Sequence, residues 1–309
     1  MKSIDELKKF FENDLQSDLH FLDEKRKKIV TQIVILEILL FSVYAASIYM
    51  CWHFDLSYGF HILFTISYTA FAWIIVKSYR GNEQFYKDFK NLVIERMINQ
   101  VDPSLHYNAY KKISLNDFKY SALFTGTFKR YHGDDFVWGQ IDGMQIQFCE
   151  LDVASGKGYN AKLDYVFHGL FLVAETNMQL PNEIIVLPKT NLNMKTVNKS
   201  FPVVHVNHAQ FETIFQIRSN DEKAVKNIFT DAFMTQMYEF ALRSKHNLYF
   251  SFHGNRAYFA VELKRKLFEP KIFQTLKDFS IIKEYFQDLY SAINIIEQLK
   301  IKNQTLEKV

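Results

Sequence analysis

Two long apolar stretches near the start of the chain constrain its fold more than any other feature. The first runs from Ile29 to Trp52 with one charged residue, Glu37, and the second runs from Leu56 to Val76 with no Asp, Glu, Lys or Arg. About 20 apolar residues of helix cross a bilayer core, so each stretch is long enough to span it. Only residues 53–55 connect them. This short connection predicts an antiparallel transmembrane hairpin over residues 29–76.

Apolar stretches of this kind also occur in the cores of large soluble proteins and in signal peptides. Neither of these two interpretations fits this sequence well. Two consecutive stretches of this length and purity are rare in soluble domains, which argues against a pair of buried core helices. A cleaved signal peptide does not fit, because the first stretch follows a charged, helix-like segment and has no small-residue cleavage site.

Basic residues gather on one side of the predicted hairpin. Residues 25–28 read Lys-Arg-Lys-Lys before the first stretch, and Lys77 and Arg80 follow the second, whereas the connection carries only Asp55. The positive-inside rule then predicts that both termini are cytoplasmic. The chain is therefore expected to be a multi-pass membrane protein, with the lipid bilayer as its first partner.

Glu37 is the one carboxyl group within the predicted spans. At 1.5 Å per residue it lies roughly 12 Å below the cytoplasmic edge, where the partner helix is expected to bring Tyr68 and Thr69. Intramembrane acids are candidates for function. Few other polar residues occur in the hairpin, so a role in packing or homo-oligomerisation is favoured over an ion path.

Charge and cysteine content exclude several classes of function. The net charge is +3, and the zinc-finger, basic-zipper and RNA-binding patterns are missing, so no nucleic-acid partner is expected. Cys51 and Cys149 are the two cysteines of the chain, far apart in sequence. They are interpreted as buried thiols rather than as a disulfide framework or a zinc site. No cofactor is expected.

The rest of the chain divides into three parts. Residues 1–28 have apolar positions at helical spacing and predict an amphipathic helix, and residues 77–113 predict a helical linker. Residues 114–309 change to short alternating runs, followed by helices and a hairpin. That order predicts a cytoplasmic α+β domain with a mostly antiparallel sheet, ending in a long helix over about 272–301.

Turn and capping residues mark elements within this domain. Asp142-Gly143 and residues 253–255 predict two hairpins. Asp221 and Thr230 are expected to cap two helices. The predicted strands cover residues 117–124, 135–141, 144–153, 163–176, 182–188, 201–206 and 211–219.

Three acids of this domain suggest a metal-dependent chemistry as an alternative. Asp134 and Asp135 follow residues 131–133, Tyr-His-Gly, and two acids with a histidine in a turn could hold a divalent cation. Glu150 is the third acid of the hydrolase hypothesis. A polar turn between two strands also accounts for the two aspartates, and this interpretation is favoured over a metal site. Residues 155–158, Ser-Gly-Lys-Gly, do not complete a phosphate loop, and no serine-elbow or zinc-protease motif occurs. No catalytic, cofactor or metal residue is therefore assigned, and the chain is expected not to be an enzyme.

An ordered set of short motifs carries a resemblance to a known family. The chain resembles the DUF3137 family of bacterial membrane-associated proteins of unknown function. The resemblance implies a bacterial membrane protein with an amphipathic N-terminal region, a hydrophobic hairpin and a cytoplasmic α+β domain, which places the expected hairpin in the inner membrane. It implies no activity. The motifs are Phe124–Phe128, Tyr131–Asp135, Gly139–Ile141, Phe148–Leu151, His168–Phe171, Phe211–Glu212, Phe215, Ser219–Asp221, Phe250–Phe252 and Leu267–Pro270.

Three functional hypotheses follow from the sequence. The favoured one is a membrane-anchored, non-enzymatic module whose cytoplasmic domain binds a protein or a small ligand. The second is a membrane-tethered, metal-dependent hydrolase that uses Asp134, Asp135 and Glu150. The third is a small oligomeric pore or transporter accessory subunit assembled around Glu37.

Overall fold

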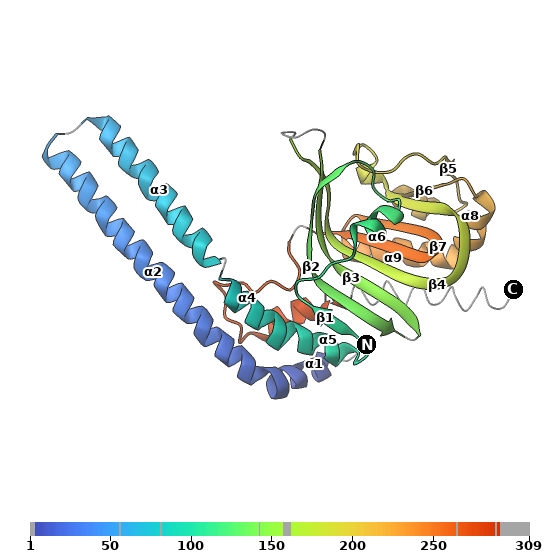
Figure 1. Cartoon of the computed structure of the whole chain (residues 1–309), viewed down its shortest axis with the longest axis horizontal. Coiled ribbons are helices and arrows are strands. Elements are labelled where there is room, and N and C mark those ends of the chain that lie inside the picture. The colour runs from blue at the N-terminus through green and yellow to red at the C-terminus, as the bar shows by residue number, and fades with distance from the viewer. Residues whose placement is uncertain are drawn as a thin grey trace. The chain divides into compact units, whose positions relative to one another are not determined.

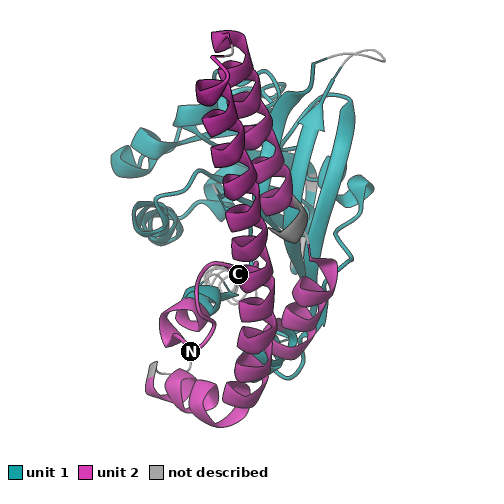
Figure 2. Cartoon of the chain, turned by 90° about the vertical axis from the view of Figure 1, so that its left-hand side faces the viewer, with its two compact units in different colours: residues 1, 95–268, 284–309 teal, residues 2–94, 269–283 magenta. Residues whose placement is uncertain are grey.

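The chain forms two compact units, one helical and one built on a sheet (Figure 2). The helical unit contains residues 2–94 and 269–283, and the sheet unit contains residues 1, 95–268 and 284–309. These units come from a computed structural model, which describes residues 4–290 except 56, 81, 142, 157–161, 264 and 288.

The helical unit is organised by two long helices. Its elements in chain order are α1 (Ile4–Phe10), the π-helical turn η1 (Phe11–Leu15), α2 (Gln16–His53), α3 (Tyr58–Arg80), α4 (Glu83–Phe89) and the π-helical turn η2 (Lys90–Ile94). α2 contains neither Gly nor Pro, so no residue breaks its backbone ladder over 38 residues. α2 and α3 run side by side as the predicted antiparallel pair (Figure 1).

Tyr44 of α2 fixes the register of the pair. Its hydroxyl is hydrogen-bonded to that of Thr65 at 3.2 Å, and its ring stacks on Tyr68 with 4.8 Å between the centroids.

The first half of α2 is packed by protein along a seven-residue repeat. This spacing is that of a helix-packing seam, and α4 and η2 lie against this part of α2. The repeat accounts for the amphipathic character of the N-terminal region that the sequence predicted. The buried positions form two series, Leu15, Leu22 and Ile29, and Leu19, Arg26 and Ile33.

Beyond Ile33 most side chains of α2 lose this cover, although Cys51 near its end is buried. Trp52 is 76% exposed, and Tyr58, at the start of α3, is 87% exposed. Among the described residues, α2 and α3 are the helices long and apolar enough to cross a membrane. The uncovered part begins after Ile33 rather than at the predicted Ile29, because residues 29–33 still pack on protein.

Residues 269–283 are here called the return segment. They follow residues 95–268 of the sheet unit in sequence, but they belong to the helical unit. Ile272 and Leu276 are buried there, and the ring of Phe279 packs edge-on against Phe11, with 5.4 Å between the centroids.

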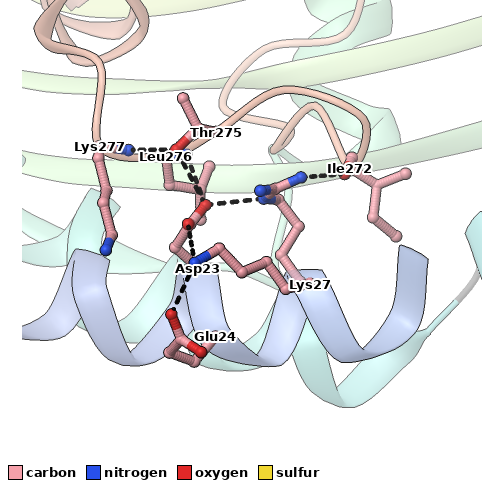
Figure 3. A network of polar contacts seen from close by, with 8 residues as sticks. Asp23, Glu24, Lys27, Ile272, Thr275, Leu276 and Lys277 are labelled. Carbon is pink, nitrogen blue, oxygen red and sulfur yellow. Dashed lines mark hydrogen bonds and ion pairs between the residues drawn. The ribbon is translucent and has the colours of Figure 1, made fainter. Parts of the chain in front are cut away.

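A buried ion pair ties the return segment to α2 (Figure 3). Arg26 Nε donates to Asp23 Oδ1 at 2.8 Å, and the same oxygen accepts from the backbone N–H of Leu276 at 3.0 Å. Thr275 Oγ1 donates to it at 3.2 Å, and Arg26 Nη1 donates to the carbonyl of Ile272 at 3.2 Å. Burial raises the pKa of Asp23, but these donors outweigh it and hold that pKa below its usual value.

The sheet unit contains an antiparallel sheet with helices packed beside it. Its path is β1-β2-β3-β4-β6-β5, and β7 pairs with β4. The fold class is therefore α+β, as predicted. The described strands are β1 (His106–Asn108), β2 (Phe128–Ile141), β3 (Met144–Ser155), β4 (Asp164–Pro188), β5 (Val203–Val204), β6 (Phe215–Ser219) and β7 (Leu248–Glu262).

Both predicted hairpins are present. Ile141 pairs with Met144, so β2 and β3 are joined by a two-residue turn that contains Gly143. β7 folds back on itself at residues 253–255, since the carbonyl of Asn247 accepts from the N–H of Glu262 at 3.0 Å.

The folded-back β7 fits between the two ends of β4. Its first arm pairs with residues 184–186 of β4 and its second arm with residues 169–175. The predicted strands 163–176 and 182–188 are thus the two ends of one long element, β4.

Several helices begin where a side chain caps them. Asp221 accepts from Ala224 N at 2.9 Å and Thr230 from Phe233 N at 3.4 Å, as predicted. The predicted strand 117–124 is wrong: a helix begins there because Ser114 Oγ accepts from Asp117 N at 3.0 Å. The helices are α5 (Glu95–Val101), α6 (Leu115–Tyr120), α7 (Ala209–Ile214), α8 (Glu222–Ile228) and α9 (Asp231–Ser244), with a 3₁₀ turn η3 (Lys189–Asn191).

Two further predicted elements need correction. The strand predicted over 211–219 is helical until Ile214, since His208 caps α7 by accepting from Phe211 N at 3.1 Å. The long helix predicted from residue 272 begins only at 279, after Asp278 accepts from Ser280 N at 2.8 Å. Its predicted part over 291–301 lies outside the described residues.

Candidate functional site

The three acids singled out from the sequence lie together on the β2–β3 ladder. Asp134 pairs directly with Glu150, and Asp135 follows at an irregularity of β2 between Asp134 and Val137. Each of the three offers a carboxylate oxygen, and these oxygens all lie within 4.8 Å of one another. We call Asp134, Asp135 and Glu150 the carboxyl cluster.

The irregularity in β2 aims Asp135 inward. Its φ is +57°, in the left-handed region that aspartate tolerates better than most residues. Its side chain is buried and accepts a hydrogen bond from the hydroxyl of Tyr107 on β1. Tyr107 was not expected from the sequence, since nothing marks a three-residue strand as the neighbour of β2.

Glu150 is buried like Asp135, and it contacts the segment after β7 and β4. Its Oε2 accepts from the backbone N–H of Leu267 at 2.6 Å, and its Oε1 lies 3.8 Å from Nε2 of His168 on β4. Burial raises the pKa of Glu150 to about 8, and the negative charges of Asp134 and Asp135 add to the rise. The N–H of Leu267 and the charge of Lys266 oppose it. Glu150 therefore keeps a proton at neutral pH.

Three carboxyl groups this close have two simple chemistries. A divalent cation such as Mg²⁺ or Ca²⁺ takes oxygen ligands of this kind. A shared proton also relieves the repulsion, because like charges at this distance cannot all ionise freely. The contacts of Glu150 and Asp135 with Leu267 and Tyr107 occupy part of the carboxylate surface that a cation needs.

Glu37 lies in the helical unit, on the part of α2 that the bilayer is expected to surround. It is half-buried, and its Oε1 is enclosed without a hydrogen-bond partner among the described residues. The hydroxyl partners expected for it are engaged elsewhere: Thr69 Oγ1 donates to the carbonyl of Ile66 at 2.9 Å, and Tyr68 stacks on Tyr44. The structure therefore leaves the carboxyl of Glu37 without the predicted support.

The two cysteines are buried free thiols, as predicted. The backbone N–H of Ile113 donates to Cys149 Sγ at 3.3 Å, and burial raises the pKa of this thiol far above its usual range. A thiol that stays protonated is a poor nucleophile.

Comparisons with known proteins bear on this arrangement. The family model of DUF3137, described as a protein of unknown function, matches residues 165–301. The match agrees, over less than half of the chain, with the resemblance found in the sequence. The match includes β4, β7 and the return segment, whereas Asp134, Asp135 and Glu150 precede it.

Curated proteins and solved structures add little. A search of curated proteins finds no match. A crystal structure of the mycobacterial trehalose monomycolate transport factor A, TtfA, is similar to 67% of this chain and 95% of that chain, at 8% sequence identity and a TM-score of 0.36. This likeness is too distant to carry an argument about fold or function.

Proposed function

We propose that this DUF3137 protein is a membrane-anchored, non-enzymatic module whose sheet unit binds a protein or a small ligand at the inner face of a bacterial membrane. The observation that carries the proposal is the exposure of the α2–α3 pair. Of the residues in the most apolar window of each helix, 11% are buried in α2 and none in α3. A helix from the core of a soluble domain would instead be mostly buried.

The length of the exposed pair supports a bilayer as its surroundings. The candidate span in α3 covers Tyr58–Lys77, which at 1.5 Å per residue is about 30 Å. A bilayer core is about 30 Å thick. Apolar area left in water costs about 25 cal/mol for each Å², and a contiguous apolar surface of this extent is rare on soluble proteins. Lipid tails remove that cost.

The charges at the two ends of the pair support the orientation. At one end of the pair, the basic residues 25–28 precede the exposed part of α2, and Lys77 lies at the end of α3. At the opposite end, the loop between the helices carries Asp55. We therefore place the loop outside the cytoplasm and both termini inside.

The contacts of the carboxyl cluster support a non-enzymatic role. Glu150 is held by Leu267 and keeps a proton, and Asp135 is held by Tyr107. These contacts join β1, β2, β3 and the segment after β7, so the cluster serves the fold of the sheet unit.

A metal-dependent hydrolase is the second candidate, because the structure brings the three acids within 4.8 Å of one another. Calorimetric titration of the full chain with Mg²⁺, Mn²⁺ and Ca²⁺ separates the two proposals. Heat of binding that Asp134→Asn abolishes, without lowering the unfolding temperature, would support the hydrolase. No heat with any of the three cations counts against it.

Alkaline carbonate extraction and cysteine labelling test the anchor and its orientation. The full chain should remain in the membrane pellet. In a background with Cys51→Ala and Cys149→Ala, an impermeant maleimide applied to intact spheroplasts should label Ser57→Cys but not Lys245→Cys. Release of the protein into the supernatant would contradict the anchor. Labelling of Lys245→Cys but not of Ser57→Cys would show that the orientation is the opposite of the proposed one.

Crosslinking in the native membrane tests the binding role. Affinity purification of the full chain should recover a stoichiometric partner that crosslinks to residues of the sheet unit. A homo-oligomer crosslinked through α2 would favour the pore or accessory hypothesis instead.

A further inference from the structure

The basic run before the exposed part of α2 is mostly neutralised by the chain itself. Lys25 Nζ lies 2.6 Å from Asp88 Oδ2 on α4. Arg26 is paired with Asp23, as described above, and Lys27 Nζ lies 2.9 Å from Glu24 Oε1. Three of the four cations at residues 25–28 therefore have a carboxylate of their own.

Lys28 and Lys77 differ from these three cations. Both are exposed, and neither has a carboxylate within 4 Å in the described part of the chain. Lys77 Nζ lies 4.6 Å from the centroid of the ring of Trp73, which is 62% exposed. An ammonium group over an exposed indole is common at a membrane surface, where the ring is amphipathic and the cation stays near the headgroups.

The register of the two helices places these cations at similar depth. Tyr44 contacts both Thr65 and Tyr68, and the helices are antiparallel, so Lys77 comes to the level of residues near Ile33. Lys28 lies five residues before Ile33, which is about 7.5 Å further out along α2. The headgroup layer on each side of a bilayer is about 5–8 Å thick. The two lysines are thus separated in depth by about the thickness of one headgroup layer.

We propose that Lys28 and Lys77, with the ring of Trp73, bind the phosphate of an anionic phospholipid at the cytoplasmic surface. This inference rests on the proposed membrane anchor and adds the lipid class that the anchor selects. Charge complementarity carries it, because these two cations lack an acid partner at the depth where lipid phosphates lie. Each lysine near an anionic surface strengthens binding about fivefold.

Lipid selectivity of the reconstituted full chain tests the proposal. The chain is placed in phosphatidylcholine vesicles with a trace of spin-labelled phosphatidylglycerol or spin-labelled phosphatidylcholine, and the motionally restricted fraction gives relative association. We expect phosphatidylglycerol to be preferred at least fivefold at low salt, and the preference to fall as salt screens the charges. The double variant Lys28→Gln/Lys77→Gln should bind both lipids about equally.

A matched double variant controls for changes of surface charge. Glu24→Gln/Lys27→Gln removes a cation together with its own acid partner, so the preference of the wild type should remain. A wild type without preference, or a Lys28/Lys77 variant that retains it, would overturn the proposal. Alkaline extraction of the same samples separates this failure from failure of the anchor, because an anchored protein stays in the pellet whichever lipid it selects.

Discussion

Arg26 donates to Asp23 at 2.8 Å inside the buried seam of α2, at a position where the seven-residue repeat otherwise places leucine or isoleucine. The pair is also hydrogen-bonded to Thr275, Leu276 and Ile272 of the return segment. A hydrophobic pair at these positions would make none of these polar contacts with the segment. We infer that the ion pair makes the packing of this segment on α2 specific.

Removing one member of this pair should cost far more than removing both. Asp23→Ala leaves the guanidinium of Arg26 buried without its anion, and we expect a loss of about 3–5 kcal/mol in the free energy of unfolding. The double variant Asp23→Leu/Arg26→Met should recover most of it. Denaturant unfolding of the full chain in detergent, followed by circular dichroism, measures both. Glu24→Ala, an exposed neighbour, should leave the transition unchanged. Equal losses in the single and double variants would contradict the account.

Glu150 should make the sheet unit less stable as pH rises. Its pKa is about 8 in the folded chain and near 4.5 when unfolded, so between these values the folded state binds more protons. The free energy of unfolding then falls from pH 4.5 to 8 and levels off above. One pKa unit corresponds to about 1.4 kcal/mol, so the total change is a few kcal/mol at most.

Unfolding temperatures across this pH range test the assignment to Glu150. Glu150→Gln is neutral at every pH and keeps an acceptor for Leu267, so its unfolding temperature should vary less than that of the wild type. Asp152→Asn on the same strand, whose ion pair with Arg130 is about 40% exposed, is the control. If the unfolding temperature of Glu150→Gln varied with pH as that of the wild type does, the titrating group would be another residue.

Two glycines of the sheet unit should respond very differently to alanine. A Cβ on Gly169 would lie 2.1 Å from the carbonyl oxygen of Val261, across the β4–β7 ladder, so Gly169→Ala should destabilise by about 4 kcal/mol or more. Gly143 also has a positive φ, but its Cβ would meet no described atom within 4 Å. Gly143→Ala should cost only about 1–2 kcal/mol. Thermal unfolding of both variants checks this order, and similar losses would show that backbone conformation alone accounts for Gly169.

Glu37→Leu should stabilise the α2–α3 pair. The enclosed Oε1 has no hydrogen-bond partner among the described residues, and an unsatisfied buried polar atom costs about 1–3 kcal/mol. The unfolding temperature of the full chain in detergent should therefore rise, with Ile38→Leu as a control on the exposed side of α2. A fall in that temperature, or loss of an oligomer, would show that Glu37 makes a contact outside the single chain.

Local chemistry determines which parts of the fold could be predicted. Asp221 and Thr230 cap helices through bonds to residues three positions later, and Gly143 turns a hairpin within two residues. Such signals are contained in a few neighbouring residues. The strand predicted over 117–124 was wrong because its aromatic residues suit a buried helix face as well as a strand. The cap at Ser114 decides between the two.

Part of the carboxyl cluster could be predicted from the sequence for the same reason. Once the turn at residues 142–143 joins β2 to β3, counting outward brings Glu150 opposite Asp135, and the irregularity of β2 shifts the pairing by one residue to Asp134. Leu267 and His168 could not be found this way, because the path of the chain after β7 and the pairing of β4 with β3 depend on the whole core.

The seam of α2 continues without a hinge into the part that the bilayer is proposed to surround. A helix of 38 residues is about 57 Å long and bends little over that distance. In the proposed membrane, a change of tilt at its exposed end would therefore reach the buried part of α2, which packs against α4 and is bonded to the return segment through Asp23. Bilayer thickness is one influence on the tilt of a spanning helix, so it would act on the buried ion pair of Asp23 as well.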